Sequence, residues 1–399
     1  SIFNYQMVMK KINTLLRQLE KYKLMRPLEE FEIPNTYPAS FVHKWKKTDW
    51  EEGMTNLKER YKKIREVRPK VYIHIPFCTQ RCNYCFYYSI PHPSTGDMRI
   101  YLNYLKREIT LMKKEVIGNT ISPESIYIGG GTPTRLSYAH LQYLIDEIIY
   151  EYLDIEGPII WTVEASPETI SKDKLNLLFR KGVNRLSIGV QTLDDSLLKI
   201  CNRAHDSKTA IHAIELALET GFPIVNVDLI YGLPNQKEHT WIKTLEKITN
   251  LQVPEITLYY LRCNRCTLFK KKDDFKWLKN EINLFNLACE FFNSSNYIRI
   301  RPHHWVLKEA VRTWKKYKAA PTTAQSREKG FVLAFGPSGY GQFENYLYQN
   351  VDNLNLYKEA IEKNLLPIRR QYLLNEEDNL VRYTCLLYTS DAADEGLGV

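Results

Sequence analysis

The sequence has no uninterrupted run of ~18 apolar residues, so it predicts no transmembrane helix. It also shows no signal peptide at its start, no internal repeat and no low-complexity segment. Eight cysteines among 399 residues do not resemble a secreted disulfide scaffold, which favours a reduced, cytoplasmic setting in which thiolates stay free. No RNA- or DNA-binding signature accompanies the net charge of +9, and a solvated surface explains that charge best.

Three of the cysteines are closely spaced after a strand-like run. Cys78, Cys82 and Cys85 have the spacing C-x3-C-x2-C, with the aromatic residue Tyr84 just before the last of them. Three thiolates on one loop can hold three irons of a [4Fe–4S] cluster, which normally takes four cysteines. Because no fourth cysteine follows nearby, one iron would stay open for a ligand, as catalytic metal sites require.

Two alternatives to a cluster stay open for these cysteines. Positions i, i+4 and i+7 share one face of a helix, although Pro76 and the β-branched run before it favour a strand followed by a loop. Zinc is the second alternative, because Cys82 and Cys85 have the spacing of a zinc half-site. The other half would be Cys263 and Cys266, but zinc ribbons usually place their two pairs ~15–20 residues apart. An incidental pair of thiols explains Cys263 and Cys266 better than an auxiliary metal site.

The sequence divides into four predicted parts. Residues 1–70 form a basic, helical N-terminal extension, and residues 71–266 alternate strands with helices. Residues 267–384 predict a smaller α+β C-terminal domain that covers the mouth of the preceding one. Residues 385–399 resemble the translation of a transposon adapter used in sequencing libraries, so we expect no role for them in fold or function. Since the chain also opens on Ser1 rather than Met, we expect the gene to be cut short at both ends.

Six apolar strands joined by helical crossovers define the fold class. Right-handed crossovers require a parallel sheet, and six βα units fall short of the eight that close a TIM barrel. The prediction is therefore an α/β fold, an open three-quarter (β/α)6 barrel with room for a large substrate. The strands are expected at residues 71–75, 125–128, 160–164, 185–190, 224–230 and 255–260, and the helices at 101–114, 141–153, 172–181, 208–220 and 238–251.

Candidate site residues lie at the C-terminal ends of these strands, where parallel barrels collect their active groups. The second strand runs into Gly129, Gly130 and Gly131, and then Thr132. A glycine run lets backbone groups approach a ligand closely, whereas a plain turn is the alternative. Glu164 ends the third strand, where its carboxylate can accept hydrogen bonds from a ligand or can simply be solvated.

The fourth and fifth strands supply four more candidates. Gln191 ends the fourth strand, and Arg203 follows with a planar charged fork that suits a carboxylate, a surface ion pair being the alternative. His205 is either a proton donor near a substrate or a polar residue at a helix start. Asp228 is flanked by apolar residues in the fifth strand, so its burial without partners would be costly.

Four strings together resemble the oxygen-independent coproporphyrinogen III oxidase family of the radical S-adenosylmethionine (SAM) superfamily. They are YIHIPFC (72–78), GGGTP (129–133), RLSIGVQ (185–191) and DLIYGLP (228–234), and the resemblance covers about residues 70–384. It implies that the three cysteines hold a [4Fe–4S] cluster whose open iron binds the amino and carboxylate groups of SAM. It also implies that the glycine run receives the amino group, that Arg203 binds the carboxylate, and that Glu164 and Asp228 are further SAM contacts.

The resemblance implies a mechanism but leaves the branch of the family open. In the family, an electron from a flavodoxin or ferredoxin cleaves SAM to methionine and a 5′-deoxyadenosyl radical, and the substrate expected here is a tetrapyrrole. True decarboxylases carry a further cysteine two residues after the third, whereas Phe86 and Tyr87 follow Cys85 here. Haem chaperones and class C methyltransferases also lack that cysteine. A coproporphyrinogen dehydrogenase-like oxidoreductase, a methyltransferase and a haem chaperone are therefore all compatible with the loop.

Overall fold

The computed structural model describes residues 45–62, 68–118, 120–157, 159–261, 268–269, 275–301, 303–317, 331–376 and 378–379. Most of the predicted N-terminal extension, Cys263, Cys266 and the adapter-like tail lie outside the described residues. The predictions for those segments therefore stay predictions.

Six parallel strands form the centre of a 13-stranded sheet in the described part of the chain. Each pairs in parallel with the next, and all six predicted strands are confirmed. The sheet order is linear, so the six βα units form the expected open (β/α)6 barrel rather than a closed one. The strands are β2 (Lys70–Ile75), β5 (Ser125–Gly130), β6 (Ile160–Ala165), β7 (Arg185–Gln191), β8 (Ile224–Tyr231) and β9 (Glu255–Tyr260).

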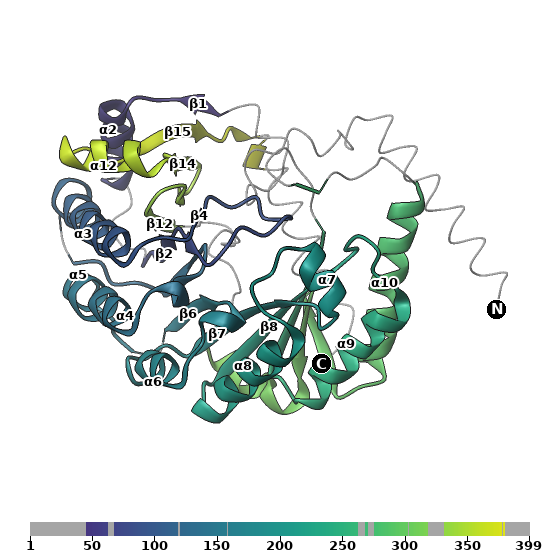
Figure 1. Ribbon diagram of the computed structural model, residues 1–399. Helices are drawn as coiled ribbons and strands as arrows, with labels where there is room; N and C mark the ends of the chain where they lie inside the picture. The colour runs from purple at the N-terminus through teal and green to yellow at the C-terminus, as the bar shows by residue number, and fades with distance from the viewer. Residues whose placement is uncertain are drawn as a thin grey trace.

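Helices form an arc outside these strands (Figure 1). Several begin at side-chain caps, for example Ser94, whose hydroxyl and Asp97 form a capping box, and Asp206, which accepts from Thr209 N. Two π-helical stretches interrupt helices that we expected to be regular, at Met112–Ile117 and Ile145–Ile149. The helices are α3 (Thr95–Leu111), α4 (Tyr138–Leu144), α5 (Tyr150–Tyr152), α6 (Lys172–Arg180), α7 (Asp195–Ile200), α8 (Ser207–Thr220) and α9 (Glu238–Asn250).

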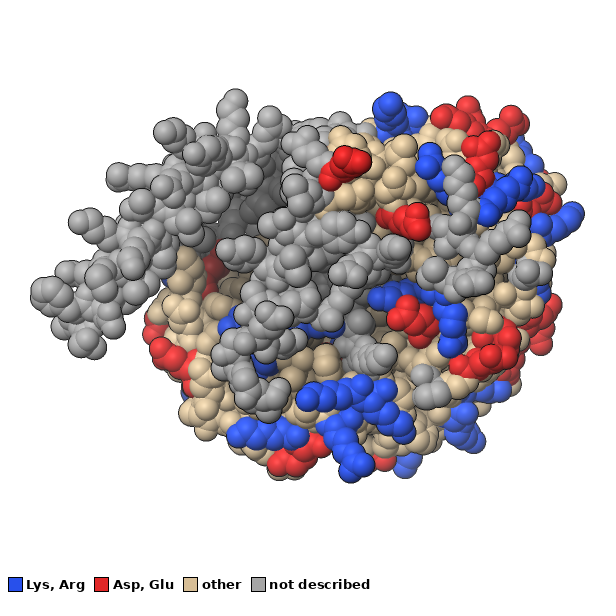
Figure 2. Space-filling model, turned by 180° about the vertical axis from the view of Figure 1, so that it is seen from behind, with Lys and Arg blue, Asp and Glu red and all other residues tan. Residues whose placement is uncertain are grey.

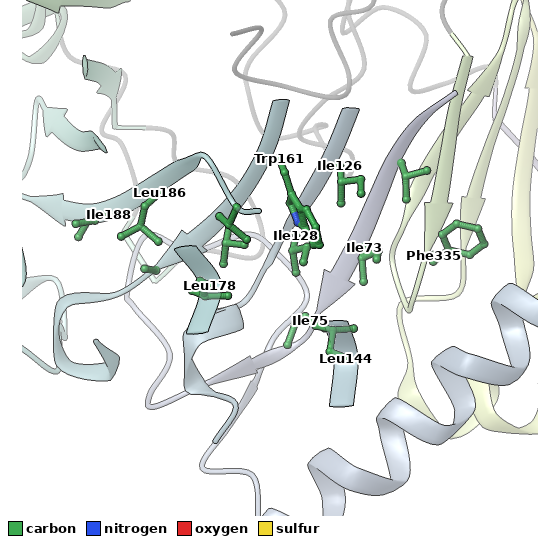
Figure 3. Packing of buried hydrophobic residues seen from close by; sticks show 14 of the residues in the cluster. Ile73, Ile75, Ile126, Ile128, Leu144, Trp161, Leu178, Leu186, Ile188 and Phe335 are labelled. Atoms are coloured by element: carbon green, nitrogen blue, oxygen red, sulfur yellow. The ribbon is translucent and has the colours of Figure 1, made fainter. Parts of the chain in front are cut away.

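The strands present an apolar face to the helices and a polar face to the inside. Figure 3 shows Ile73, Ile128 and Leu186 packed with Leu144 of α4 and Leu178 of α6, and all five are fully buried. Because successive side chains of a strand point to opposite faces, the residues between these apolar ones lie on the inner face. Those residues include Tyr72, His74, Tyr127, Glu164, Ser187, Asn226, Asp228 and Thr257.

The C-terminal strands extend the same sheet at both edges, whereas we expected them to cover its mouth. β12 (Phe331–Phe335) pairs in parallel with β2, and β11 (His304–Leu307) pairs antiparallel with β9. This pairing satisfies backbone groups that would otherwise be exposed along the edges of the parallel sheet. Beyond them lie β13 (Tyr340–Phe343), β14 (Tyr346–Asn350), β15 (Ile368–Leu373) and β1 (Lys46–Lys47) on one side and β10 (Tyr297–Arg301) on the other.

The remaining helices are α2 (Trp50–Tyr61), α10 (Phe275–Asn293), α11 (Val311–Lys316) and α12 (Leu354–Glu362). Within the described residues, no helix combines the length and the apolar character that crossing a bilayer requires. Basic and acidic side chains are interspersed over the face shown in Figure 2, in line with a solvated surface. The domain borders at residues 70, 266 and 384 stay predictions.

Candidate functional site

The three cysteines lie on a loop that starts and ends at a short parallel strand pair. β3 (Phe77–Cys78) pairs with β4 (Ile90–Pro91), and Cys85 N donates to Cys82 O over 3.1 Å within the loop. The three thiols are free, partly buried and close enough to interact electrostatically. Burial, followed by the neighbouring Cys82, raises the pKa of Cys85 to about 12. The free Cys85 thiol therefore holds its proton at neutral pH, and metal binding would release it.

The last turn of α7 and the residues after it clamp this loop. Asn83 donates from its backbone N to Cys201 O over 3.0 Å and from its side chain to Ile200 O over 2.7 Å. Asn202 has a positive φ of 53° and donates from its side chain to Arg81 O over 2.8 Å. The loop is thus fixed by elements that are more than 100 residues away in the sequence.

The glycine-rich segment at the end of β5 fixes the start of the same loop. Gly131 N donates to Ile75 O and Thr132 N donates to Phe77 O, both over 2.8 Å. The Thr132 hydroxyl donates to the Cys78 sulfur over 3.6 Å. The structure therefore brings the predicted Gly129–Thr132 segment and the first cysteine together.

Gly129 and Gly130 are needed for close packing inside the site. A Cβ on Gly129 would lie 2.8 Å from the Glu164 carboxyl group, and a Cβ on Gly130, which has a φ of +107°, would lie 2.6 Å from the His74 ring. Glu164 accepts hydrogen bonds from Gly130 N over 3.1 Å and from the Tyr127 hydroxyl over 2.6 Å. Burial raises the pKa of Glu164 to about 7 against the opposing effect of Tyr127.

Asp228 lies on the inner face with two polar partners. Its carboxylate accepts from Asn226 Nδ2 and from Ser187 Oγ, each over 2.9 Å. Burial raises the pKa of Asp228 to about 6, although Arg185 opposes the shift. Tyr259 on the neighbouring strand is 44% exposed, yet burial raises the pKa of its phenol well above 10. The charge of Asp228 adds to this shift, so the two side chains lie close together on the inner face.

Arg203 connects the cysteine loop to the strand ends. Its Nη1 donates to the Cys82 sulfur over 3.3 Å and to the Tyr84 hydroxyl over 3.2 Å. Its Nη2 donates to Ser166 Oγ over 2.9 Å and to Gly189 O over 2.6 Å. The Nε atom is buried and has no hydrogen-bond partner among the described residues. The predicted carboxylate-binding fork thus lies beside the Cys82 sulfur with one donor unused.

Gln191 and His205 lie next to Arg203. Gln191 has a φ of +70° at an irregularity of the β7–β8 pairing, a strained conformation for a non-glycine residue. Its amide nitrogen lies 2.7 Å from where a Cβ of Gly189 would be. His205 is buried, its Nε2 lies 3.3 Å from Val190 O, and burial lowers its pKa. Because both ring nitrogens face protein groups, His205 is better placed to hold its neighbours than to donate a proton to a substrate.

The sequence reasoning missed two side chains at this site. Ser166 and Glu168 follow Glu164 on the same strand-end segment, and both join the surroundings of Arg203. Their proximity to Glu164 in the sequence was the only available signal. The contact of Ser166 with Arg203, 37 positions further along, could not be inferred from it.

The sulfurs and their neighbours fit a cluster. Among the described residues, no three His, Cys, Asp or Glu side chains converge in a way that could hold one metal ion. Cluster ligands need not converge on a point, because each thiolate binds its own iron. Donors already face two of the sulfurs, from Thr132 to Cys78 and from Arg203 to Cys82. Hydrogen bonds of this kind stabilise thiolate ligands and tune the metal site.

Comparison with known proteins shows to which proteins the chain is similar. The model of the radical SAM superfamily matches residues 72–248. The haem chaperone HemW of Bacillus subtilis is 37% identical over 318 residues, which cover 77% of this chain and 80% of that protein. The oxygen-independent coproporphyrinogen III oxidase of Helicobacter pylori is 28% identical over 319 residues, 78% of this chain and 69% of that protein.

The fold matches a solved structure. Coproporphyrinogen III oxidase (HemN) of Escherichia coli, described as a radical SAM enzyme, superimposes with a TM-score of 0.74 at 24% identity. The match covers 89% of this chain and 82% of that one. The family model, the relatives and the fold thus agree, and the chain belongs to the radical SAM superfamily, in the family of the oxygen-independent coproporphyrinogen III oxidases and HemW haem chaperones.

Proposed function

We propose that Cys78, Cys82 and Cys85 hold the [4Fe–4S] cluster of this family and that SAM binds beside it at the strand ends. The family's cofactors are this cluster and SAM. The observation that carries the proposal is Arg203, which reaches the Cys82 sulfur and keeps one buried donor unused. A carboxylate forms strong, directed hydrogen bonds to a guanidinium, and SAM brings such a carboxylate to the cluster.

The other predicted residues line the adjoining surface. In this proposal the backbone of Gly129, Gly130, Gly131 and Thr132 receives the amino group of SAM, while Glu164, Gln191 and Asp228 contact its remaining polar groups. When bound, the cluster would supply one electron, received from a flavodoxin or ferredoxin, for the reductive cleavage of SAM to methionine and a 5′-deoxyadenosyl radical. The protein's own residues bind SAM, orient it and keep water away.

The proposed activity is that of a radical SAM oxidoreductase like coproporphyrinogen dehydrogenase, with a tetrapyrrole as substrate. The oxidases among the relatives and the matching fold support this choice. The methyltransferase alternative draws no support from the comparisons. We also propose a cytoplasmic location, where thiols stay reduced before they bind iron.

A second candidate function, delivery of haem, is supported by a specific observation. Phe86 and Tyr87 occupy the positions after Cys85, so the further cysteine of the decarboxylases is replaced by an aromatic pair whose ring centroids are 4.7 Å apart. The relative with 37% identity is a haem chaperone, which agrees with this departure. Such a protein would keep the cluster but bind haem in a fixed ratio.

One experiment separates the two functions. The reconstituted protein is incubated without oxygen with SAM, dithionite and either coproporphyrinogen III or haem, and the products are identified by mass spectrometry. An oxidase gives 5′-deoxyadenosine together with a decarboxylated tetrapyrrole. A chaperone leaves coproporphyrinogen unchanged and binds one haem per chain in a spectroscopic titration.

Replacement of Arg203 with lysine tests the SAM site directly. Lysine keeps the positive charge but loses the planar fork, so Arg203→Lys should weaken SAM binding about tenfold or more while iron content stays the same. Titration of the reconstituted protein with SAM measures the affinity, and iron analysis provides the control. Unchanged affinity would remove Arg203 from the SAM site.

A further inference from the structure

Arg203 is held by a network of hydrogen bonds that leads to a second acidic residue. Arg203 Nη2 donates to Ser166 Oγ over 2.9 Å, and the Ser166 hydroxyl donates to Glu168 Oε2 over 2.5 Å. His205 Nδ1 lies 3.4 Å from the same Glu168 oxygen and 3.5 Å from Arg203 Nη2. These four side chains form one connected group around Arg203 Nη2, whereas Nη1 donates to Cys82.

Glu168 supplies the negative charge of this group. Burial alone would raise the pKa of Glu168, but the hydrogen bond from His205, the charge of Arg203 and the hydrogen bond from Ser166 outweigh it and lower the pKa to about 2. Glu168 is therefore ionised at neutral pH. A buried cation without a counter-charge is unfavourable, and the Ser166 hydroxyl bridges the two charged groups, because it accepts from Arg203 Nη2 and donates to Glu168 Oε2.

The network fixes the direction of the whole guanidinium group. Ser166 and the Gly189 carbonyl, which is 2.6 Å from Nη2, hold one nitrogen of the fork. Because the guanidinium is planar and rigid, fixing Nη2 also fixes the directions of Nη1 and Nε. Nη1 then reaches the Cys82 sulfur, and the Nε–H remains available for an acceptor.

We infer that Glu168 and Ser166 are positioning residues that hold Arg203 in the orientation in which it binds the carboxylate of SAM beside the cluster. This inference rests on the proposed function, since it assumes that Arg203 meets SAM. The role of Glu168 is indirect, because it contacts Ser166 and His205 rather than the ligand. His205 also contacts Glu168 and Arg203, so it takes part in positioning Arg203, a role that involves no proton transfer to a substrate.

A double-mutant cycle tests this role. Glu168→Gln, Arg203→Lys and the double variant are reconstituted without oxygen, and each is titrated with SAM while the electron paramagnetic resonance spectrum of the reduced cluster is recorded. Glu168→Gln should weaken SAM binding about tenfold and reduce the spectral change that SAM causes. The double variant should bind SAM no more weakly than Arg203→Lys alone, because Glu168 acts only through Arg203.

Two further variants separate positioning from general stability. Glu168→Asp keeps the charge and should bind SAM more tightly than Glu168→Gln does. Ser166→Ala removes the hydroxyl that connects Glu168 to Arg203, so its SAM affinity should resemble that of Glu168→Gln. Glu219→Gln, on the exposed surface of α8, is the matched control and should change nothing. Iron content should stay the same in all of these variants, and Glu219→Gln should also keep the thermal midpoint of the unchanged protein.

The possible failures are distinguishable. If Arg203→Lys weakens SAM binding but Glu168→Gln does not, the positioning role is overturned and the proposed SAM site stands. If the two effects add in full in the double variant, Glu168 acts independently of Arg203 and the inference is also overturned. If Arg203→Lys itself has no effect, the proposed SAM site fails.

Discussion

Replacing Cys78, Cys82 or Cys85 with alanine should abolish the iron–sulfur cluster, whereas the unchanged protein should bind about four irons and four sulfides per chain. Each of these cysteines binds a separate iron in the proposed site, so no neighbour can replace a missing thiolate. The loop itself should persist, because Asn83 holds it through its backbone N to Cys201 O and through its side chain to Ile200 O, not through the sulfurs. Iron and sulfide analysis after anaerobic reconstitution, together with the visible spectrum, measures the loss.

Other cysteines of the same chain provide matched controls. Cys289 on α10 is free and partly exposed, and Cys289→Ala should keep a full cluster. Cys263 and Cys266, which lie outside the described residues, should also be dispensable. Bound zinc without iron–sulfur absorbance, or a cluster that survives loss of one motif cysteine, would contradict the assignment.

Removal of the Glu255 side chain should strongly destabilise the fold. Arg185 Nε donates to Glu255 Oε2 over 2.9 Å, and the two side chains are 2% and 0% exposed. His304 Nδ1 approaches the other carboxylate oxygen at 3.2 Å. Glu255→Ala would leave Arg185 buried without its partner, which typically costs about 3–5 kcal/mol. Chemical denaturation of the variant measures this loss.

The same pair predicts how stability depends on pH. Burial would raise the pKa of Glu255, but Arg185 and then His304 outweigh it and lower the pKa from 4.5 to about 2. Because the folded-state value is the lower one, the contribution of this group is fully present above pH 4.5. It is lost as the pH falls through about 2. Glu255→Gln should remove this part of the acid dependence.

An exposed ion pair serves as the control for Glu255. Lys363 and Glu359 lie 2.7 Å apart at the end of α12, with side chains 57% and 47% exposed. Because such pairs contribute little, Glu359→Gln should change the unfolding free energy by less than about 0.5 kcal/mol. Equal effects of Glu255→Ala and Glu359→Gln would contradict the view that the Arg185–Glu255 pair is a buried support of the barrel.

The central strands could be predicted because their signals are local. The apolar run at residues 224–230 predicts the bounds of β8 to within one residue, and the glycines at 129–131 mark the end of β5. The C-terminal strands were harder, since β11, β13 and β15 carry mixed polar residues and owe their order to pairing with distant partners. Hydrophobic periodicity does not report such long-range pairing.

The sequence indicates which residue types belong to the candidate site, but not which of them contact one another. The sequence predicts that Arg203 binds a carboxylate, but it does not predict the hydrogen bonds of Arg203 to Cys82 and Ser166, which lie 121 and 37 residues away. Glu168 gave no signal of its own, because a glutamate after a strand end is ordinary in sequence. Its role emerges only from the hydroxyl of Ser166 lying 2.5 Å away.

Anaerobic incubation with SAM and dithionite tests the central claim most directly. We predict that the reconstituted protein converts SAM to 5′-deoxyadenosine and methionine, and that Cys82→Ala and Arg203→Lys form far less of both, while Cys289→Ala behaves like the unchanged protein. Chromatography with mass detection measures the two products. A protein that holds a full cluster and binds SAM but releases no 5′-deoxyadenosine would contradict the proposed enzyme and favour the haem-delivery function.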